Sequence, residues 1–288
     1  MTTILNGKIV RDEIAARLKE KVAGFTKKPV LAIIQVGKVE ESSAYISQKK
    51  KFADEIGAIV QHIELPLDVS QDEVIAKIDE LNHNESIHGI ILQLPVPQEL
   101  KSVDIIDYID PLKDVDGLTS VNMKLLEEDD PRGFVPATTK GVMSLLDYYH
   151  IDVAGKKILM IGRSRLVGKP TAQALINRKA LVTVAHSQTL DLMKETHNAD
   201  VIIVAIGKPR YIGAEFLKAG QIVIDVGINL DTIGLKEEIP GKRKLVGDVD
   251  FESVKDIVAA ISPVPGGVGA MTVASLFENL VVAYEKQN

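Results

Sequence analysis

The fold is decided by one stretch of the chain, Ile158-Leu-Met-Ile-Gly-Arg-Ser-Arg-Leu-Val-Gly-Lys-Pro170. It reads as an apolar strand that enters a glycine-bearing loop and continues as a helical pattern. This order of elements brings backbone N–H groups and a helix N-terminus to a pyrophosphate. The usual second glycine of G-x-G-x-x-G is absent, because an arginine and a serine follow Gly162 and the next glycine is Gly168. The stretch predicts a nucleotide-binding α/β fold, with a ligand-free α/β turn as the alternative.

A second apolar strand, Leu181–Ala185, indicates which nucleotide this fold takes. It ends in His186-Ser187, where an NAD-binding fold usually carries an Asp or Glu that binds the ribose hydroxyls. Without that carboxylate, a 2′-phosphate meets no repulsion. Arg163 supplies positive charge and Ser187 supplies a hydroxyl. The sequence therefore predicts NADP in preference to NAD as the cofactor.

Composition places the chain among ordinary globular proteins. Its 288 residues suggest roughly two domains, and 45% hydrophobic with 26% charged residues is typical of a soluble core and surface. The formal net charge of −6 gives no general reason to bind nucleic acid or anionic membrane. The absence of cysteine excludes disulfides, thiolate metal sites and cysteine nucleophiles. The six histidines show no paired ligand spacing, so we expect no metal.

The apolar runs of the chain are short. Val201–Ile206 is one of them, and it is too short to cross a bilayer. The first residues lack the charged and apolar blocks of a secretion signal. We therefore expect a cytoplasmic protein with no membrane partner.

Strand-like and helix-like segments alternate almost throughout the chain, which favours an α/β protein with parallel sheets. In the first part, the pattern predicts strands and helices over residues 30–36, 43–56, 60–65, 71–82 and 89–94, in the order strand, helix, strand, helix, strand. In the second part, it predicts strands over residues 157–161, 181–185, 201–205 and 222–226.

We expect a first domain over residues 1–139 and a Rossmann-like nucleotide-binding domain over residues 140–270. The break between them is expected in the acidic, proline-bearing segment 127–133. After it, Thr138 or Thr139 can cap a helix that runs toward residue 148. The last segment has the apolar period of a helix, and residues 271–288 are expected to pack back on the first domain.

Tyr45 and Lys49 lie four residues apart on a predicted helix, so both project from one face about one turn apart. Lys49 also opens the cluster Lys49-Lys50-Lys51, for which a solvated basic helix face is an equally good interpretation. The spacing Y-x-x-x-K also occurs in short-chain dehydrogenases, where the pair handles the proton of an alcohol. The order of elements argues against that family, because its glycine loop precedes the pair, whereas Tyr45 lies upstream of Gly162.

Two further polar features of the first part look chemical. Gln93 is an amide within the otherwise apolar stretch 91–97, and a bare buried amide is costly, so we expect it to have a partner. Asp114 and Asp116 would point the same way if their segment, Lys113-Asp-Val-Asp-Gly117, were extended. The pair suits a metal or a polar ring, although a solvated Asp-Gly turn is the more frequent meaning of such a sequence.

With these residues, the chain resembles the bifunctional methylenetetrahydrofolate dehydrogenase/methenyltetrahydrofolate cyclohydrolase family over nearly its whole length. Each motif alone is weak, but their order and spacing together are very specific. The motifs are Val36-Gly37, Tyr45 with Lys49, Gln93-Leu-Pro95, Lys113–Gly117, Gly162-Arg-Ser164, Val167-Gly-Lys-Pro170, His186-Ser-Gln-Thr189, Asp225-Val-Gly-Ile-Asn229, Gly247-Asp-Val249, Pro263–Gly269 and Met271-Thr272.

The resemblance implies two α/β domains flanking a cleft, with a catalytic folate-binding domain first and a Rossmann-like NADP-binding domain with a parallel sheet second. It implies NADP-dependent oxidation of 5,10-methylenetetrahydrofolate to 5,10-methenyltetrahydrofolate, and hydrolysis of that product to 10-formyltetrahydrofolate. Such one-carbon chemistry feeds purine, methionine and histidine biosynthesis. The resemblance also implies a homodimer formed through the nucleotide domains.

By the same resemblance, Lys49 is the general acid/base. A free lysine has a pKa of about 10.4, so burial and the cationic substrate have to lower it. The expected catalytic residues are Lys49, Tyr45, Gln93 and Asp116. The expected folate-binding residues are Tyr45, Gln93, Leu94, Pro95, Asp116, Pro265, Gly266 and Gly267. The expected cofactor-binding residues are Gly162, Arg163, Ser164, Ser187 and Ile228.

Two other interpretations stay open at this point. One is another NADP-dependent two-domain dehydrogenase of a different small substrate, with Lys49 as its catalytic lysine. The other is a nucleotide-sensing module whose first domain binds a partner. Neither requires Gln93, Asp116 and the loop Pro263–Gly269 at once.

Overall fold

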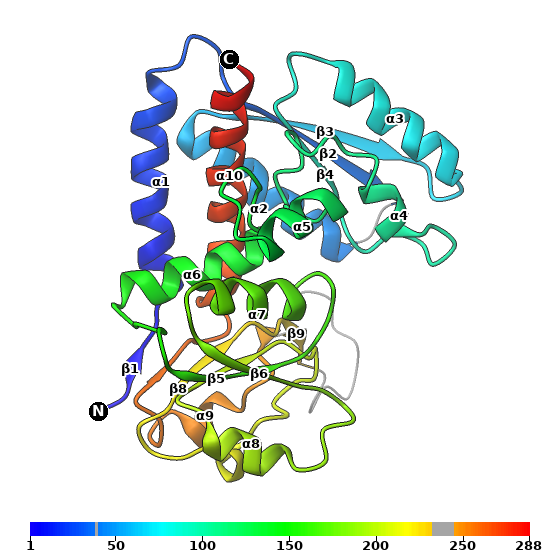
Figure 1. The fold of residues 1–288 in the computed structure, drawn as a ribbon. Helices are drawn as coiled ribbons and strands as arrows, with labels where there is room; N and C mark the ends of the chain where they lie inside the picture. Colours follow the sequence, from blue (N-terminus) through cyan, green and yellow to red (C-terminus); the bar gives the residue numbers. More distant parts are fainter. Residues whose placement is uncertain (38–39, 232–244) are drawn as a thin grey trace. The chain divides into compact units, whose positions relative to one another are not determined.

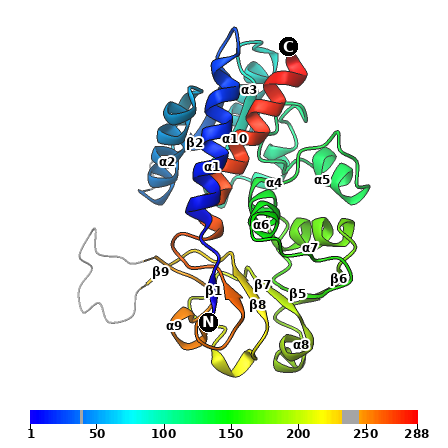
Figure 2. The ribbon, with the colours of Figure 1, turned by 90° about the vertical axis from the view of Figure 1, so that its left-hand side faces the viewer.

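The computed structural model describes residues 1–37, 40–231 and 245–288, and the chain divides into two compact units. Unit 1 holds Met1–Arg11 and Thr138–Thr272, and unit 2 holds Asp12–Ala137 and Val273–Asn288 (Figures 1 and 2). This division differs from the expected boundaries at the N-terminus, because residues 1–11 belong to unit 1. The reason is a pairing that no local pattern reveals: β1 (Thr3–Ile4) pairs in parallel with β11 (Ala260–Ile261).

Unit 1 is built on a six-stranded sheet in the order β1-β11-β8-β7-β5-β6, in which every adjacent pair is parallel. Short apolar runs of this kind form strands that are buried on both faces of a parallel sheet. The longer strands agree with the predicted ones to within a residue at each end. They are β5 (Lys157–Ile161), β6 (Leu181–Ala185), β7 (Val201–Val204) and β8 (Ile222–Asp225). A separate antiparallel pair consists of β9 (Asn229–Leu230) and β10 (Leu245–Val246).

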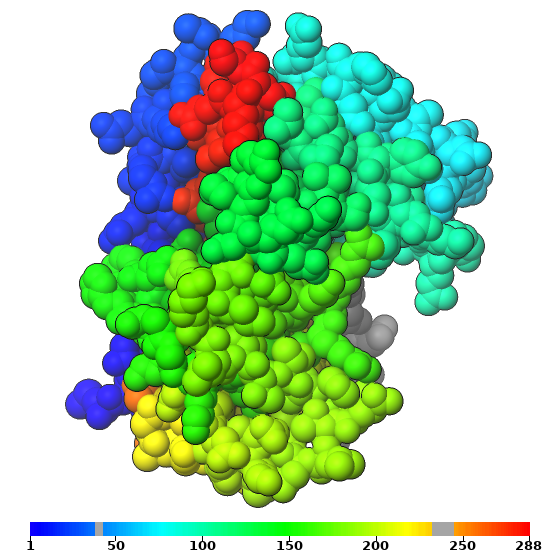
Figure 3. Space-filling view, viewed as in Figure 1, coloured from blue at the N-terminus to red at the C-terminus, as the bar shows by residue number. Residues whose placement is uncertain are grey.

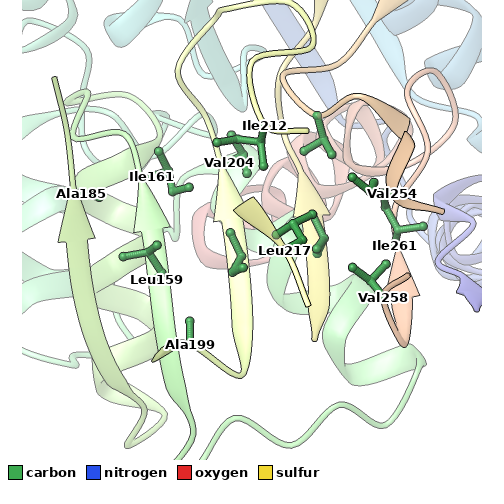
Figure 4. Close-up of a cluster of buried hydrophobic side chains, with 13 residues drawn as sticks. Leu159, Ile161, Ala185, Ala199, Val204, Ile212, Leu217, Val254, Val258 and Ile261 are labelled. Atoms are coloured by element: carbon green, nitrogen blue, oxygen red, sulfur yellow. The ribbon is translucent and has the colours of Figure 1, made fainter. Parts of the chain in front are cut away.

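Helices cover both faces of this sheet. Figure 1 shows α7 (Gly168–Asn177) on one face, with α8 (Leu192–Asn198) and α9 (Phe251–Val254) on the other. A short 3₁₀ helix, η1, spans Ala214–Phe216. Figure 4 shows the buried cluster of one face, to which β5 contributes Leu159 and Ile161, two residues apart. Residues two apart share a face of a strand, so the pleat itself assembles this core.

The strand order of unit 1 creates a topological switch point. The chain passes from β5 to β6 on one side, and then to β7 on the other side of β5. Open α/β sheets bind their ligands outside the carboxyl ends of the strands at such a point. Gly162 follows β5 and Ala205 follows β7, so these two positions mark where a nucleotide is expected in unit 1.

Unit 2 contains a three-stranded parallel sheet in the order β3-β2-β4. The central strand β2 is buried from Leu31 through Val36, which explains its continuous run of apolar residues. Its strands are β2 (Val30–Val36), β3 (Ile59–Leu65) and β4 (Gly89–Leu92). Its helices are α2 (Glu40–Ile56), α3 (Gln71–His83), α4 (Ser102–Ile106) and α5 (Ser120–Glu127), with most of α1 (Gly7–Ala23) and α10 (Val268–Gln287).

Helix α3 shows how local sequence sets an element. Ser70 caps it: the Glu73 N–H donates to the Ser70 hydroxyl, and the Ser70 N–H donates to the Glu73 carboxylate at 2.9 Å. Its buried residues are Val74, Ile78 and Leu81, which recur at helical spacing. The opposite face of α3 lies at the surface in the space-filling view, in cyan (Figure 3).

Helix α10 supplies a large part of the unit 2 core through its residues from Val273 onward. Phe277 packs on Phe52 of α2 with ring centroids 5.2 Å apart. The Asn279 side-chain amide donates to the carbonyls of Val115 and Val135, at 2.9 and 3.0 Å. Among the described residues, neither α10 nor another helix is long and apolar enough to span a membrane.

The acidic segment 127–133 does not separate the units, contrary to the expected position of the break. It follows α5 as a turn within unit 2, closed by an ion pair of Asp130 with Arg132 at 2.6 Å. The chain leaves unit 2 after Ala137, where α6 (Ala137–Tyr148) begins. Thr138 and Thr139 therefore lie inside the first turn of α6 and do not precede it as caps. The Thr139 hydroxyl instead meets the hydroxyl of Thr171 on α7 at 3.0 Å.

The N-terminal segment supports the loop 262–267 between β11 and α10, all within unit 1. The Gly7 N–H donates to the Gly266 carbonyl at 2.8 Å. A Cβ at Gly7 would lie 2.1 Å from the Gly267 carbonyl oxygen, a backbone atom that cannot move without moving the loop. Glycine at position 7 is thus required by the close approach of two chain segments far apart in sequence.

We predict that Gly7→Ala destabilises the protein by about 1–3 kcal/mol, the usual cost of forcing extra atoms into a packed site. Gly24→Ala is the matched control, because Gly24 is exposed and its Cβ would meet only the Lys21 carbonyl oxygen at 3.5 Å. The control should stay within about 0.5 kcal/mol of the parent protein. Thermal denaturation followed by circular dichroism gives the comparison, and equal midpoints for the two variants would contradict the close approach.

Candidate active site

The first group of candidate residues lies in unit 2, around Lys49. Lys49 is half-buried on α2, and its ammonium donates to Oε1 of Gln93 at 2.7 Å. Gln93 follows β4, is buried, and donates through Nε2 to the Leu94 carbonyl at 2.8 Å. A carbonyl only accepts, so this second bond fixes the amide with its oxygen toward Lys49. The amide therefore has the expected partner, and it holds the lysine nitrogen whether that nitrogen is charged or neutral.

The residues of the motif Lys113–Gly117 make different contacts. Lys113 is buried and donates to the carbonyls of Leu81, Asn82 and Asn84 at the end of α3, at 3.2, 2.7 and 2.9 Å. Asp114 is buried too. Its carboxylate accepts from the N–H groups of residues 117–119 and from the Asn122 amide. The segment is a turn and not extended, with Gly117 at φ +72°. Both oxygens of the Asp114 carboxylate accept hydrogen bonds within this turn. Asp116 is therefore the candidate of the pair for binding a ligand.

Burial controls the charges of this group. Burial lowers the pKa of Lys49, and the nearby Asp116 carboxylate offsets part of that effect. Burial also raises the pKa of Asp116 to about 6, with the charge of Lys49 opposing the rise and the charge of Asp114 adding to it. A lysine whose pKa moves toward neutrality can accept a proton as well as donate one, which suits a general acid/base.

The remaining candidates of unit 2 lie around this group. Tyr45 is on α2 one turn before Lys49 and is 36% exposed. Leu94 is half-buried and Pro95 is exposed, and the peptide bond between them is cis. The roles assigned to these three residues stay predictions, because their geometry alone fixes no contact with a substrate.

Pro265, Gly266 and Gly267 lie in unit 1, in the loop before α10. A Cβ at Gly267 would lie 2.6 Å from the Pro263 carbonyl oxygen, so the loop's own folding requires that glycine. Gly266 has φ +108° with no atom closer than 3.6 Å to its Cβ position, so conformation and not crowding favours glycine there. The expected close approach to a substrate stays a prediction for this loop.

The second group of candidates lies at the carboxyl ends of the unit 1 strands. A Cβ at Gly162 would lie 2.2 Å from the Ala205 carbonyl oxygen, and one at Gly168 would lie 2.3 Å from the Gly162 carbonyl oxygen. Gly168 thus allows the start of α7 to pack against the end of β5, which is the role of the third glycine in G-x-G-x-x-G. This packing brings the loops after β5 and β7 together at the switch point.

The cofactor candidates on these loops differ in their exposure and in their hydrogen bonds. Arg163 and Ser187 are exposed after β5 and β6, with no carboxylate at the end of β6 to repel a 2′-phosphate. Ile228 is exposed after β8. Ser164 is exposed, but its hydroxyl accepts from the N–H groups of Val167 and Gly168 at 3.3 Å each. Exposed positive charge, an open hydroxyl and a tight glycine turn together fit a phosphorylated dinucleotide.

No role was predicted from the sequence for the buried residues Lys113 in unit 2 and Asp248 in unit 1. Asp114 was expected to face a metal or a polar ring, and it instead binds the N–H groups of its own turn. Asp248 is fully buried in the described part of the chain. A local signal existed only for Asp114, which lies three residues before Gly117 in a sequence typical of a turn, whereas the N–H donors of Asp248 lie 40–42 residues away in the chain. The metal alternative for Asp114 and Asp116 finds no support, since the described residues contain no group of three metal-ligating side chains.

Comparison with known proteins identifies the family of the chain. The family described as "Tetrahydrofolate dehydrogenase/cyclohydrolase, catalytic domain" matches residues 5–116, and its "NAD(P)-binding domain" matches residues 136–288. The bifunctional protein FolD of Agathobacter rectalis is 41% identical over 289 aligned residues, covering 99% of this chain and 100% of that protein.

Two solved structures have a similar fold. The bifunctional FolD enzyme of Campylobacter jejuni has a TM-score of 0.94 and 40% identity, covering 100% of both chains. The Trypanosoma brucei dehydrogenase-cyclohydrolase, solved with NADP and an inhibitor, has a TM-score of 0.92 and 35% identity, covering 99% of this chain and 98% of that one.

Fold and site together define a two-unit α/β enzyme with a Rossmann-like NAD(P)-binding unit, which confirms the predicted fold class. The chain belongs to the tetrahydrofolate dehydrogenase/cyclohydrolase family, as the sequence motifs predicted. It is a bifunctional one-carbon folate enzyme with both activities of that family, and its cofactor is NADP. The alternatives of a different dehydrogenase or a nucleotide sensor are not favoured.

The charge coupling in unit 2 gives a prediction about Asp116. Its carboxyl should titrate near pH 6, and Lys49→Met should raise that midpoint, because the ammonium charge that stabilises the carboxylate is removed. Carboxyl ¹³C NMR of protein labelled at aspartate measures the titration, and Asp116→Asn identifies the signal by its disappearance. A midpoint near the ordinary value of 3.8, or one that Lys49→Met leaves unchanged, would contradict the coupling.

Proposed function

We propose that Lys49 transfers the protons of the hydrolytic reaction, whereas the hydride reaction depends on positioning alone. The observation that carries this proposal is the 2.7 Å contact of Lys49 with the fixed Gln93 amide, next to Asp116. The two reactions share one folate substrate, which is 5,10-methylenetetrahydrofolate in the first and 5,10-methenyltetrahydrofolate in the second.

The oxidative step removes a hydride from the methylene bridge and leaves a cation shared by two nitrogens. NADP, when bound, supplies the nicotinamide ring that accepts the hydride. No proton is released, so this step needs no base. Unit 1 contributes by holding the two reactants in contact, which by itself accounts for large rate enhancements.

The hydrolytic step does need proton transfer. Water adds to the methenyl carbon, and the neutral Lys49 amine takes the proton that this water loses. The resulting hydroxyl adduct collapses by breaking one carbon–nitrogen bond, and the Lys49 ammonium returns a proton to the departing nitrogen. The hydroxyl proton of the adduct leaves to solvent as the formyl C=O forms, so the hydrolysis of the cation releases one proton overall. The product is 10-formyltetrahydrofolate. The lowered pKa of Lys49 supports both directions of transfer near neutral pH.

The other candidate residues have roles in this scheme that follow from their chemistry. Asp116 accepts two hydrogen bonds from the amino and ring N–H groups of the pteridine, a pattern that a carboxylate satisfies well. Gln93 holds the Lys49 nitrogen, and Tyr45 stacks or hydrogen-bonds beside the folate. The remaining folate contacts are assigned to Leu94, Pro95, Pro265, Gly266 and Gly267.

In unit 1, the 2′-phosphate is assigned to Arg163 and Ser187, and the nicotinamide side to Ile228. Gly162 and Ser164 are assigned to the loop that faces the pyrophosphate. The charge of Arg163 and the absent carboxylate after β6 support a preference for NADP over NAD. The family's pattern also leads us to propose a homodimer through unit 1, a cytoplasmic location and a supply of one-carbon units for purine, methionine and histidine synthesis.

Lys49→Met separates the two reactions. The variant keeps the bulk of the stem and removes the amine, so cyclohydrolase activity should fall about 10²–10⁴-fold, the usual value of general acid–base assistance. Dehydrogenase activity should survive to a measurable degree, because hydride transfer needs no base. NADPH formation and the decay of methenyltetrahydrofolate absorbance follow the two steps separately. Near-normal cyclohydrolase activity with a collapse of dehydrogenase activity would refute the proton-transfer role.

Arg163→Ala tests the choice of cofactor. If the guanidinium contacts the 2′-phosphate, the variant should raise the KM for NADP by about 10-fold or more, since a hydrogen bond to a charged group is worth about 1.5–3 kcal/mol. The KM for NAD should change little, because NAD has no 2′-phosphate. Initial rates with each dinucleotide at saturating folate provide the values, and equal losses for both would show that Arg163 does not read this group.

A further inference from the structure

Asp248 is a fully buried carboxylate surrounded by donors in unit 1. Its Oδ2 accepts from the N–H groups of Ile206 and Gly207 at 2.7 and 3.0 Å, and its Oδ1 accepts from that of Lys208 at 2.8 Å. Oδ1 also accepts from the Asn229 side-chain amide at 2.8 Å. One side chain therefore ties the loop after β7 to the segment after β8.

A second buried carboxylate holds Asp248 in place. Asp225, at the end of β8, accepts through Oδ1 from the N–H groups of Gly227 and Asp248 at 2.9 and 3.0 Å. Its Oδ2 accepts from the Val249 N–H at 2.9 Å. A Cβ at Gly227 would lie 2.2 Å from Cγ of Asp248, so this glycine leaves room for the arrangement.

The position of this pair matters for the cofactor. Residues 206–208 leave β7 at the switch point, directly after the Ala205 carbonyl that Gly162 approaches. Residues 227–229 leave β8 and carry Ile228, which is exposed between two residues tied to the aspartates. The two segments that Asp248 joins are thus the ones that follow adjacent strands at the ligand-binding edge of the sheet.

We propose that Asp248 is a positioning residue for hydride transfer, which fixes the segments 206–208 and 227–229 that hold the nicotinamide ring. This inference rests on the proposed placement of the nicotinamide beside Ile228. Asp248 touches neither substrate nor cofactor and acts through the backbone. Its effect belongs to the dehydrogenase reaction alone, because the hydrolytic step uses no nucleotide.

Unit 2 contains the same construction, which offers a matched comparison. Asp114 accepts from the N–H groups of Gly117, Leu118 and Thr119 at 2.9, 3.2 and 2.8 Å, and from the Asn122 side-chain amide at 2.8 Å. Both aspartates thus bind three successive N–H groups and one asparagine amide. The turn that Asp114 holds carries Asp116, which is proposed to bind the pteridine in both reactions.

The test replaces each aspartate by asparagine. In either variant one carboxylate oxygen becomes an NH₂ group that faces N–H donors, so part of the cage is lost and the segment shifts. Asp248→Asn should lower the dehydrogenase kcat by about 10²-fold, the effect of a misplacement of about 1 Å, and leave cyclohydrolase activity within about 2-fold of the parent. Asp114→Asn should lower both activities.

Two measurements separate positioning from general damage. Without any cofactor, Asp248→Asn should speed amide hydrogen exchange at residues 206–208, whereas exchange at residues 117–119 stays unchanged. The primary isotope effect with methylene-deuterated substrate should rise, since hydride transfer becomes slower than release steps. If Asp248→Asn does not fold, Asn229→Ala removes one donor only, and should lower dehydrogenase activity by about 3–10-fold with cyclohydrolase activity retained.

An unchanged dehydrogenase kcat in the folded Asp248→Asn variant, or equal losses of both activities, would overturn the proposal. So would unchanged exchange at residues 206–208. The parent protein is measured in the same two assays. If it turned over neither folate, the proposed function would fail, whereas a failure confined to the Asp248 variants would leave that function intact.

Discussion

Each unit depends on a buried carboxylate that binds a run of backbone N–H groups where the chain turns away from its sheet. Asp114 does this in unit 2, and Asp248 does it in unit 1. Loops at a ligand site cannot satisfy their own N–H groups by secondary structure, so an acceptor must be supplied. Each hydrogen bond to a charged acceptor contributes about 1.5–3 kcal/mol, so several such bonds can fix the conformation of a loop that has no regular secondary structure. The residues assigned to substrate and cofactor can then lie on these loops, while the buried aspartates fix the conformation of the loops.

In the group around Lys49, burial changes the pKa values of charged side chains. There the charges are only partly compensated, since burial lowers the pKa of Lys49 and raises that of Asp116. Shifted pKa values of this kind suit proton transfer, whereas Asp114 shapes the turn that carries Asp116. The motif Lys113–Gly117 places both kinds side by side: Asp114 binds the N–H groups of its turn, and Asp116 lies near Lys49.

Division of labour between the units follows from what each reaction needs. Proton transfer requires a side chain with a shifted pKa, and such a group lies in unit 2. Hydride transfer requires two reactants held in register, and unit 1 offers a switch point whose loops are joined by Asp248. A bifunctional enzyme can therefore lose one reaction and keep the other, and the residues that separate them need not contact either substrate.

The sequence by itself determined the longer strands, the helices α2, α3, α6 and α10, and the family, and through the family it named Lys49 and Gln93 as candidate catalytic residues. Apolar runs, helical spacing and turn residues are local signals, and they suffice for those conclusions. It could not place residues 1–11 in the sheet of unit 1, because the pairing of β1 with β11 joins positions more than 250 residues apart. Nor could it find the structural roles of Asp114 and Asp248 as acceptors of backbone N–H groups. Only the tertiary structure decided that Asp114 binds the N–H groups of its own turn while Asp116 lies near Lys49. The partners of Asp116 and Asp248 come from segments far away in the chain, so no local pattern identifies them.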